Sequence, residues 1–568
     1  MLPKWSSTLS QASCRLTARL LATYNAPMSN PPTATASPNF PRLGVGSWLL
    51  LLLAGGLLLL VGWRVADFVA TSSYWLPYPF PRQGSEGLTM YEALLLRGGE
   101  NIYLPLSPTR FISAPYPPLY YLLTAALLDP QRPDFAAGRL LSFGASFVAA
   151  TCVGLTVYCA VGGRAGLPGR FGGAARLLAA AVAGGLFLSL PPVLVWASRY
   201  RADMVALALV AAGLAAMQAR PAGWGAWLAA AAFALSFYTK QTYLAGPLGG
   251  GLYLLLLSWQ GRRLGQSNAA RGVTFRFALL WGCGLAALLL LPTLLLSAAT
   301  RGGYWDKMVT YHNLPWEAKT FSRLLAALLE NHWPLLLLAA AYLAYESYRL
   351  LKQGRQPTIA RLAICLPYLL ASLLLLPSGG VVGADSNHLL AVALALVLVA
   401  GEGLGRAMLA AGGSRPLSYY LPAAIVVLAI GGYLLSSATP AGWYGLDLRQ
   451  PDAATQAQLA RVVSNVTSNP GKDYLADEVG LLVLAGKRPA YDDLFTMTAL
   501  ANKRLWDESA VRAGLAGESF ALVLLANAPN ELRRDIMTAG MRAALQQHYY
   551  VKFADVWYTY EGNSLKPK

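Results

Sequence analysis

Charged residues are scarce in this sequence, and a few of them lie beside long apolar runs. Glu86 lies just before a predicted helix over 88–97, and Asp203 begins another predicted helix after Arg199 and Arg201. A charge so close to an apolar segment is costly to keep there and is therefore a candidate for function. Carboxylates hold hydroxyls, take up protons or bind a divalent cation, and guanidiniums bind phosphate oxygens. These four side chains together suit a sugar-phosphate substrate.

Four further residues have suitable chemistry. Lys240 stands between two apolar runs and would supply a cation for a lipid-linked phosphate. Asn387 and His388 would donate hydrogen bonds to phosphate or sugar oxygens. The ring of Tyr116 would offer a planar face to a sugar. We therefore predict a site made of Glu86 and Asp203 as catalytic carboxylates with substrate-binding residues around them, namely Tyr116, Arg201, Lys240, Asn387 and His388.

Each candidate also has a structural explanation. Glu86 can be a carboxylate that a helix N-terminus favours, and Asp203 can cap its helix and pair with a neighbouring arginine. Lys240 can extend to the outer headgroups, and a lone histidine such as His388 is more often structural than catalytic. The histidines show no spacing typical of a zinc site.

The elements that must position these residues are predicted to be membrane spans. The chain is 55% hydrophobic and 13% charged, with a mean hydropathy of +0.43, which excludes a soluble globular enzyme. We predict an all-α polytopic membrane protein with about eleven transmembrane helices. The predicted spans lie near 46–66, 138–160, 176–196, 203–219, 224–239, 242–258, 275–297, 332–350, 361–377, 388–406 and 419–437.

The charge distribution predicts the orientation of these spans. The net charge is +18, and the basic residues concentrate in alternate connections, which places the N-terminus in the cytoplasm and the chain after 437 outside the plasma (inner) membrane. We exclude nucleic-acid binding, because the positions of the basic residues are explained by the orientation of the spans. Residues 1–45 read as a disordered cytoplasmic tail, with Met1 and Met28 both open as the start.

Two outer regions deserve separate predictions. Within the long first loop, 67–137, the apolar segment 117–128 is too short to cross, so we expect a helix in the outer interface with Tyr116, Tyr120 and Tyr121 at the headgroups. Residues 438–568 are predicted to form a soluble extracytoplasmic α/β domain. Its expected elements are strands 473–476 and 520–525 and helices 508–515 and 532–548, with solvated turns at 477–478 and 492–493.

Several short motifs, weak alone, form an ordered series on the same predicted side of the membrane. They are Ser85-Glu86-Gly87, the segments 98–103 and 116–121, Arg201-Ala202-Asp203, Thr239-Lys240-Gln241 and the segment 383–388. This series resembles the C-type (GT-C) superfamily of membrane glycosyltransferases over residues 46–437. The likeness is greatest to the bacterial family 39 type, similar to protein O-mannosyltransferases and lipid A aminoarabinose transferases.

The resemblance implies inverting transfer of a hexose or mannose-like sugar from a polyprenyl-phosphate donor to a lipid, polysaccharide or protein acceptor on the outer face. Glu86 would be the first-loop acid, Asp203 the second-loop acid, and Lys240 and Arg201 the phosphate contacts. Many members have an Asp-Glu pair where this chain has Ser85-Glu86. Glu86 alone would hold Mg²⁺ or Mn²⁺ loosely, so we expect a metal-free reaction with Glu86 as the base.

Two other classes of protein remain open. A transporter or flippase of lipid-linked sugars also has many spans, but transporters usually place ionisable residues near the bilayer midplane, in matching halves that this sequence does not show. A non-catalytic sugar-binding scaffold would leave Glu86 and Asp203 dispensable.

Overall fold

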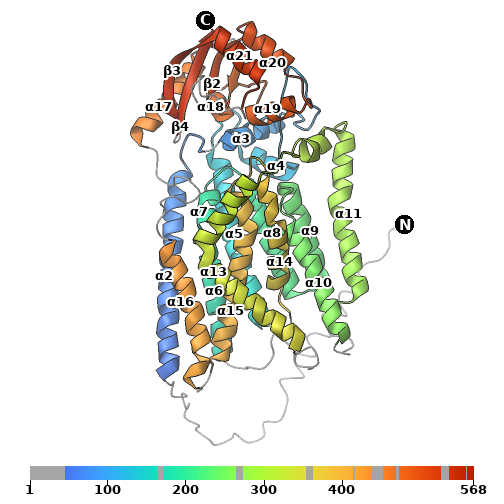
Figure 1. Cartoon of the computed structure of the whole chain (residues 1–568), viewed down its shortest axis with the longest axis vertical. Coiled ribbons are helices and arrows are strands. Elements are labelled where there is room, and N and C mark those ends of the chain that lie inside the picture. The colour runs from blue at the N-terminus through green and yellow to red at the C-terminus, as the bar shows by residue number, and fades with distance from the viewer. Residues whose placement is uncertain are drawn as a thin grey trace, which may run out of the picture. The chain divides into compact units, whose positions relative to one another are not determined.

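A computed structural model gives the fold (Figure 1). It describes residues 45–82, 84–162, 170–263, 273–352, 362–412, 416–437, 452–468, 473–525, 536–557 and 560–567. The predicted N-terminal tail, including both candidate start residues, lies outside these ranges apart from residue 45.

Long apolar helices make up most of residues 45–437. Five of those described are long and apolar enough to cross a membrane, and a sixth span results if Gly172–Leu188 and Pro191–Ala197, bent by 62°, are taken as one. The protein is therefore a membrane protein, and the count of eleven spans stays a prediction. The helices are α2 (Val45–Trp75), α5 (Ala136–Gly162), α6 (Arg170–Leu188), α7 (Pro191–Ala197), α8 (Asp203–Ala219), α9 (Trp224–Thr239), α10 (Ala245–Arg263), α11 (Phe275–Ala299), α13 (Ala318–Lys352), α14 (Cys365–Leu375), α15 (Leu390–Ala410) and α16 (Leu421–Ser436).

Burial separates the central helices of this set from the peripheral ones. The apolar window of the α15 span is 83% buried by its neighbours, whereas that of α11 is 17% buried and exposes large side chains such as Leu294 and Leu295. Leucines on an outer helix face suit contact with lipid, because a bilayer replaces water there. The α15 helix thus runs through the core, and its two ends carry polar residues into buried surroundings.

The first loop contains α3 (Gly84–Arg97) and α4 (Pro118–Leu127). At ten residues, or roughly 15 Å, α4 is too short to cross a bilayer. The prediction that its tyrosines lie at the headgroups is wrong, because Tyr120 and Tyr121 are fully buried. The Tyr121 hydroxyl donates to Glu92 Oε2 at 2.6 Å, and the Tyr120 ring packs edge-on against Tyr200. A protein partner for each ring holds these tyrosines inside.

Two further loops are joined by backbone pairing. The first contains α12 (Gly303–Trp305) and the π-helical turn η2 (Asp306–Thr310), and the second contains the 3₁₀ turns η3 (Leu376–Gly380) and η4 (Ser386–Leu389). Glu317 N donates to Gly380 O at 2.8 Å, and Val382 N donates to Pro315 O at 2.9 Å. These bonds fix the loop that contains η2 beside the loop that contains η3 and η4.

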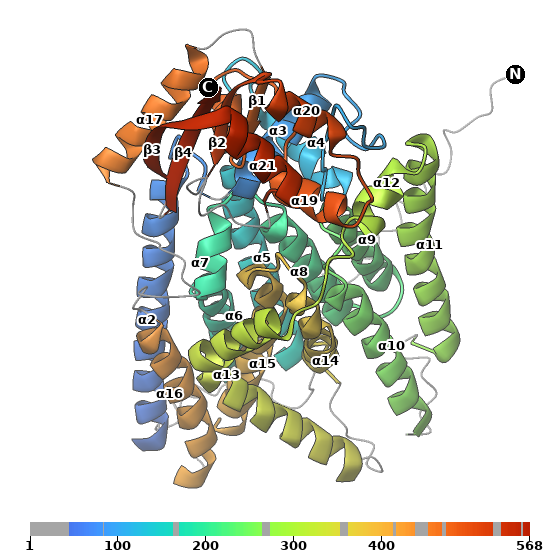
Figure 2. The same ribbon diagram turned by 45° about the horizontal axis from the view of Figure 1, so that its top comes forward.

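The C-terminal region contains a mixed four-stranded sheet (Figure 2). The strand order is β1-β2-β4-β3, with β1 and β2 parallel and the other two pairs antiparallel. Strands β1 and β2 have the bounds predicted from the sequence, because short apolar runs favour buried strands. The elements are α17 (Ala453–Thr467), β1 (Asp473–Ala476), α18 (Val479–Leu484), α19 (Leu494–Asn502), α20 (Ser509–Ala516), β2 (Phe520–Leu525), α21 (Ala539–His548), β3 (Tyr549–Trp557) and β4 (Tyr560–Pro567).

This region is held to the first loop by buried polar contacts. Phe111 N donates to Ala490 O at 2.8 Å, and the Asp492 carboxylate accepts from Ser113 N at 3.0 and 3.2 Å. The prediction of solvated turns at 477–478 and 492–493 is wrong, because Glu478 is 4% exposed and Asp492 is 2% exposed. Their carboxylates satisfy backbone N–H groups that burial would otherwise leave without partners.

Candidate functional site

The site centres on Asp203, the first residue of α8, whose side chain is fully buried. Its Oδ1 lies 2.6 Å from Lys240 Nζ and accepts from Asn387 Nδ2 at 3.0 Å, while its Oδ2 lies 3.6 Å from Arg201 Nε. Asp203 does not act as a helix cap, since the N-cap residue is Ala202 and has no side-chain bond. The structure thus brings together four of the predicted residues from three separate segments, those of 201–203, 240 and 387.

The ring of Tyr116 closes one side of this group. Its centroid lies 5.3 Å from the Arg201 guanidinium carbon and 5.4 Å from Lys240 Nζ. An aromatic face attracts cations without using their hydrogen-bonding capacity. Lys240 and Arg201 are therefore positioned by a ring and a carboxylate that leave part of their donor capacity for another partner.

His388 lies in η4, the turn that leads into α15, next to Asn387. Within the described residues its ring makes no hydrogen bond to Asp203 or Lys240, although both charges lie near enough to affect it. The turn is fixed from the other side by Trp196, whose indole N–H donates to Ser386 Oγ at 3.0 Å. The structure therefore places His388 beside the site, with Asn387 in direct contact.

Glu86 occupies a different environment from the one its predicted role requires. The side chain is fully buried, and each carboxylate oxygen accepts two hydrogen bonds. Oε1 accepts from Arg139 Nε at 3.1 Å and Tyr200 N at 2.7 Å, and Oε2 accepts from Arg139 Nη2 at 2.8 Å and Arg82 N at 2.6 Å. A carboxylate has about four acceptor positions, so none is left for a substrate hydroxyl in this arrangement. The geometry does not favour Glu86 as a base.

The charge on Glu86 is nevertheless secure. Burial alone would raise the pKa of Glu86, but the Arg139 charge and the hydrogen bonds outweigh burial and lower it. The carboxylate is thus ionised and holds the backbone of Tyr200, next to Arg201, in place. Arg201 in turn donates to Ser85 Oγ. Glu86 therefore positions the segment that carries the phosphate-binding candidates.

Three more arginines surround this site, and sequence reasoning missed two of them, Arg82 and Arg139. Arg139 is the buried partner of Glu86, Arg82 donates to Ser198 Oγ at 2.7 Å, and Arg199 lies 4.7 Å from the Trp196 ring. Only Arg199 had been noted, as a partner for Asp203. The other two could not be identified, because 53 residues separate Arg139 from Glu86 and 116 separate Arg82 from Ser198.

The local charge balance favours an anion. The cations around the site are Arg82, Arg139, Arg199, Arg201 and Lys240, and the carboxylates are Glu86, Asp203 and Asp385. Five cations against three carboxylates leave a positive excess in a largely buried place. Among the described residues, Arg201 Nε is a buried donor without a hydrogen-bond acceptor. A phosphate group would supply both the missing charge and the missing acceptor.

The same donor set does not suit a divalent cation. The Glu86 oxygens already accept four hydrogen bonds, and Asp203 is paired with Lys240. Within the described part of the chain, no three His, Cys, Asp or Glu side chains gather as metal ligands would. Mg²⁺ and Ca²⁺ need several oxygen ligands, which this group of cations does not offer.

Comparisons with known proteins identify the fold. No protein-family model matches the chain, and no curated protein matches it either. Its structure is similar to ArnT from Cupriavidus metallidurans bound to undecaprenyl phosphate, with a TM-score of 0.56 and 14% identity over 92% of this chain and 98% of that one. ArnT in the apo state gives a TM-score of 0.54 at 14% identity, over 89% and 98% of the two chains. ArnT is a lipid A aminoarabinose transferase of the C-type superfamily. The resemblance predicted from the sequence is confirmed at the level of structure: this chain has the fold of the C-type membrane glycosyltransferases.

Proposed function

We propose that the protein is a membrane glycosyltransferase that takes a sugar from a polyprenyl-phosphate donor and passes it to an acceptor on the outer face of the plasma membrane. The observation that carries this proposal is the buried cationic group of Lys240 and Arg201 around Asp203. The similar fold of ArnT, solved with undecaprenyl phosphate, supports a lipid phosphate as the anion. The proposal includes about eleven spans, a cytoplasmic N-terminus and an extracytoplasmic C-terminal region.

In this proposal the phosphate of the donor lies against Lys240 and Arg201. Their charges stabilise the phosphate as it leaves with the electron pair of the broken bond to the anomeric carbon. Asn387, His388 and Tyr116 orient the donor headgroup, and Asp203 fixes Lys240 and Asn387 at the same point. Glu86 acts through Tyr200 and Arg201 as a positioning residue, and no metal ion takes part.

A transporter of lipid-linked sugars remains the alternative function, because it would need the same phosphate contacts. It differs in one respect: transport leaves the bond between sugar and phosphate intact. Release of free or transferred sugar therefore separates the two functions.

The test compares wild type with Lys240→Met in detergent, using undecaprenyl-phosphate donors that carry different labelled sugars. We expect wild type to release sugar with and without EDTA, and Lys240→Met to be at least about 100-fold slower, because removing one preorganised transition-state contact has an effect of this size. Lys319→Met, an exposed lysine of α13, is the matched control. The double variant Asp203→Asn with Lys240→Met avoids an unpaired buried charge.

Each outcome is informative. Equal turnover by wild type and both Lys240 variants, all folded, would remove Lys240 from the site. Binding of the donor by wild type without release of any sugar from the donor panel would favour the transporter. Loss of wild-type turnover in EDTA would overturn the metal-free reaction.

A further inference from the structure

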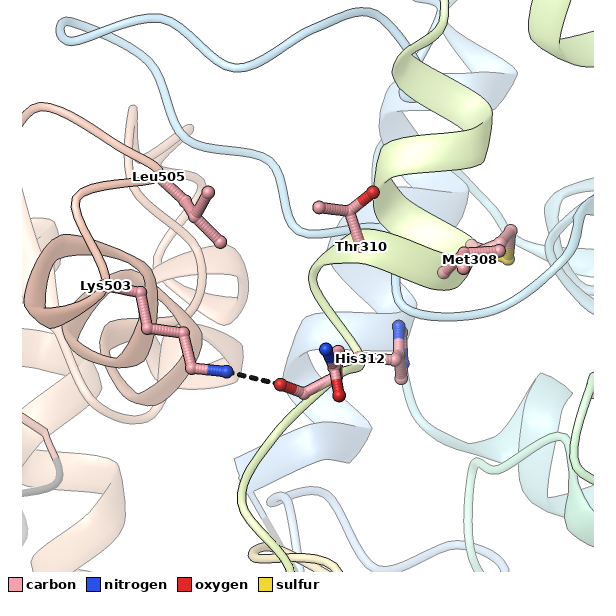
Figure 3. Close-up of a pocket in the computed structure, with 7 residues that line it drawn as sticks. Met308, Thr310, His312, Lys503 and Leu505 are labelled. Carbon is pink, nitrogen blue, oxygen red and sulfur yellow. Dashed lines mark hydrogen bonds between the residues drawn. The ribbon is translucent and has the colours of Figure 1, made fainter.

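A groove opens between the π-helical loop and the C-terminal region (Figure 3). Its volume is about 830 Å³. One wall consists of Met308, Val309, Thr310, His312 and Asn313, and the other includes Lys503 and Leu505. Lys503 Nζ donates to Asn313 O across the groove. The groove therefore has apolar and polar walls, as a site for a sugar or other hydroxyl-bearing molecule would need.

His312 is held in this groove in a defined tautomer. Its Nδ1 lies 2.6 Å from Lys307 O, and a carbonyl only accepts hydrogen bonds. The proton of the neutral ring is therefore on Nδ1, and the lone pair is on Nε2. The turn itself is rigid, because Lys307 Nζ donates to Ile102 O at 2.6 Å and to Ile112 O at 2.7 Å.

The other ring nitrogen is available. Among the described residues, His312 makes a hydrogen bond through Nδ1, and the residue is exposed at the groove. The protein atoms behind the ring remove part of its water and lower the pKa of His312, and Lys240 adds to this effect, whereas the bond to Lys307 O and the charge of Asp493 oppose it. Near neutral pH the ring is a neutral base with an accessible lone pair.

The groove adjoins the phosphate site. The loop that carries His312 is bonded through residues 315–317 to residues 380–382, the segment before Asn387. The start of α19, with Asp493, lies against the same segment, since a Cβ on Gly383 would contact Phe495 at 3.4 Å. Lys240 is close enough to His312 to affect its charge. His312 thus lines the groove on a loop that is bonded to the segment leading into Asn387.

We infer that His312 is the general base for a hydroxyl-bearing acceptor that binds in this groove. The inference rests on the proposed function. It assigns to His312 the role of base, which the hydrogen-bonded Glu86 carboxylate does not fill in this arrangement. His312 Nε2 takes the proton of the acceptor hydroxyl while its oxygen forms the bond to the anomeric carbon. The bond between that carbon and the phosphate oxygen breaks, and the polyprenyl phosphate leaves with the electron pair. The Asp493 carboxylate then faces the imidazolium that forms.

Two substitutions separate this role from a structural one. His312→Asn keeps a donor at the position of Nδ1 for Lys307 O but has no group at Nε2, whereas His312→Ala loses both. We expect both variants to bind undecaprenyl phosphate like wild type and to release sugar about 100-fold or more slowly, the usual effect of losing a general base. His548→Asn, which changes the histidine beside Glu518 in α21, is the matched control. Full recovery of turnover in His312→Asn would mean that His312 only holds its loop and would overturn the inference.

A second readout does not depend on turnover. Diethyl pyrocarbonate acylates an accessible, unprotonated ring nitrogen, so modification at His312 should be half-maximal below the ordinary histidine pKa of about 6.5. The charged groups around the ring are Lys240, Asp493 and Lys503. In the pH dependence of the rate of sugar release, the fall on the acidic side should disappear in the His312 variants alone. No modification at His312, or an unchanged acidic limb, would contradict the inference. Loss of turnover in Lys240→Met with normal turnover in His312→Asn would overturn this inference and leave the proposed function intact.

Discussion

In the proposed orientation the α15 span has an outer end near Asn387 and an inner end near Arg406, and a different buried ionic group lies beside each end. At its outer end, Asn387 joins Asp203 and Lys240 in a group where cations outnumber carboxylates. At its inner end, Arg406 lies between Glu346 and Glu402, both fully buried. The Tyr342 hydroxyl also donates to Glu402 at 2.6 Å.

The difference between these groups concerns what each still lacks. The inner group contains a cation bound on two sides by its own carboxylates, so it needs no further anion. Among the described residues, the outer group has cations in excess and a buried Arg201 Nε without a hydrogen-bond acceptor, and a groove lies beside it. Burial of charge therefore does not by itself identify a site. A buried group that lacks an opposite charge and adjoins an open groove does, because a ligand can supply what is missing.

The largest effect should come from breaking the inner group. Arg406→Met removes the buried cation that lies against two buried carboxylates, and we expect a loss of about 3–5 kcal/mol in the free energy of unfolding. Turnover per folded molecule should not change. Unfolding followed by tryptophan fluorescence in detergent measures the loss, and Arg276→Met, an exposed arginine of α11, is the control. Normal stability with lost turnover would mean that the inner group is functional.

Replacing Glu86 tests whether this buried carboxylate is structural, like the inner group, or takes part in the reaction. In Glu86→Gln the buried Arg139 keeps only the carbonyls of Trp75, Tyr78 and Phe80, so we expect a loss of up to about 3–5 kcal/mol in the free energy of unfolding. Glu100→Gln, in a half-exposed ion pair of the same loop, should change stability by about 0–1 kcal/mol. A Glu86→Gln protein as stable as wild type but inactive would restore Glu86 as the base.

The sequence was sufficient for features that depend on local pattern. Hydropathy predicted spans at 138–160 and 275–297, where α5 and α11 lie, because a membrane helix is recognisable from one continuous apolar run. Single charges beside such runs likewise indicated Asp203 and Lys240. Partners distant in sequence could not be predicted: the acidic pair at 492–493 resembles a surface turn until Ser113, 379 residues away, is seen to donate to Asp492. The position of Glu86 beside an apolar run correctly marked it as unusual. Its four hydrogen-bond donors could not be predicted, because they come from three separate segments.

Replacing Arg201 should affect ligand binding more than stability, whereas replacing Arg406 should affect stability and leave turnover unchanged. In Arg201→Met, Asp203 keeps Lys240 as its cation and the new side chain still packs between Tyr116 and Trp196, so the free energy of unfolding should fall less than in Arg406→Met. Loss of a charged hydrogen bond to phosphate costs about 1.5–3 kcal/mol, or roughly a 10- to 150-fold weaker dissociation constant for undecaprenyl phosphate. Stabilisation by added lipid phosphate measures this change. Arg220→Met, at the other end of α8 beside Trp224, is the matched control and should bind the lipid normally. Equal weakening in both variants would indicate a general effect of charge.

The smallest effect concerns a third buried group, between the first loop and the C-terminal region. Burial raises the pKa of Glu92 despite hydrogen bonds from Tyr121, Ala114 and Ser113, and burial raises the pKa of Asp492 as well. The folded protein therefore holds the Glu92 proton more tightly than the unfolded chain does. Stability from this residue is fully present below the ordinary carboxyl pKa of about 4.3 and declines as the pH rises toward the raised value.

We expect the unfolding midpoint of wild type to fall between about pH 4.3 and neutrality, with Glu92 responsible for on the order of 1 kcal/mol of that change. Glu92→Gln resembles the protonated form at every pH, so its midpoint should depend less on pH over the same interval. Glu100→Gln should keep the wild-type slope, since its carboxylate is partly exposed. Parallel curves for wild type and Glu92→Gln would show that Glu92 is ionised in the folded protein throughout. The Lys307 ammonium would then compensate the charge of Glu92, since the two charges interact. Burial lowers the pKa of Lys307, and its hydrogen bonds to Ile102 O and Ile112 O hold it against the first loop.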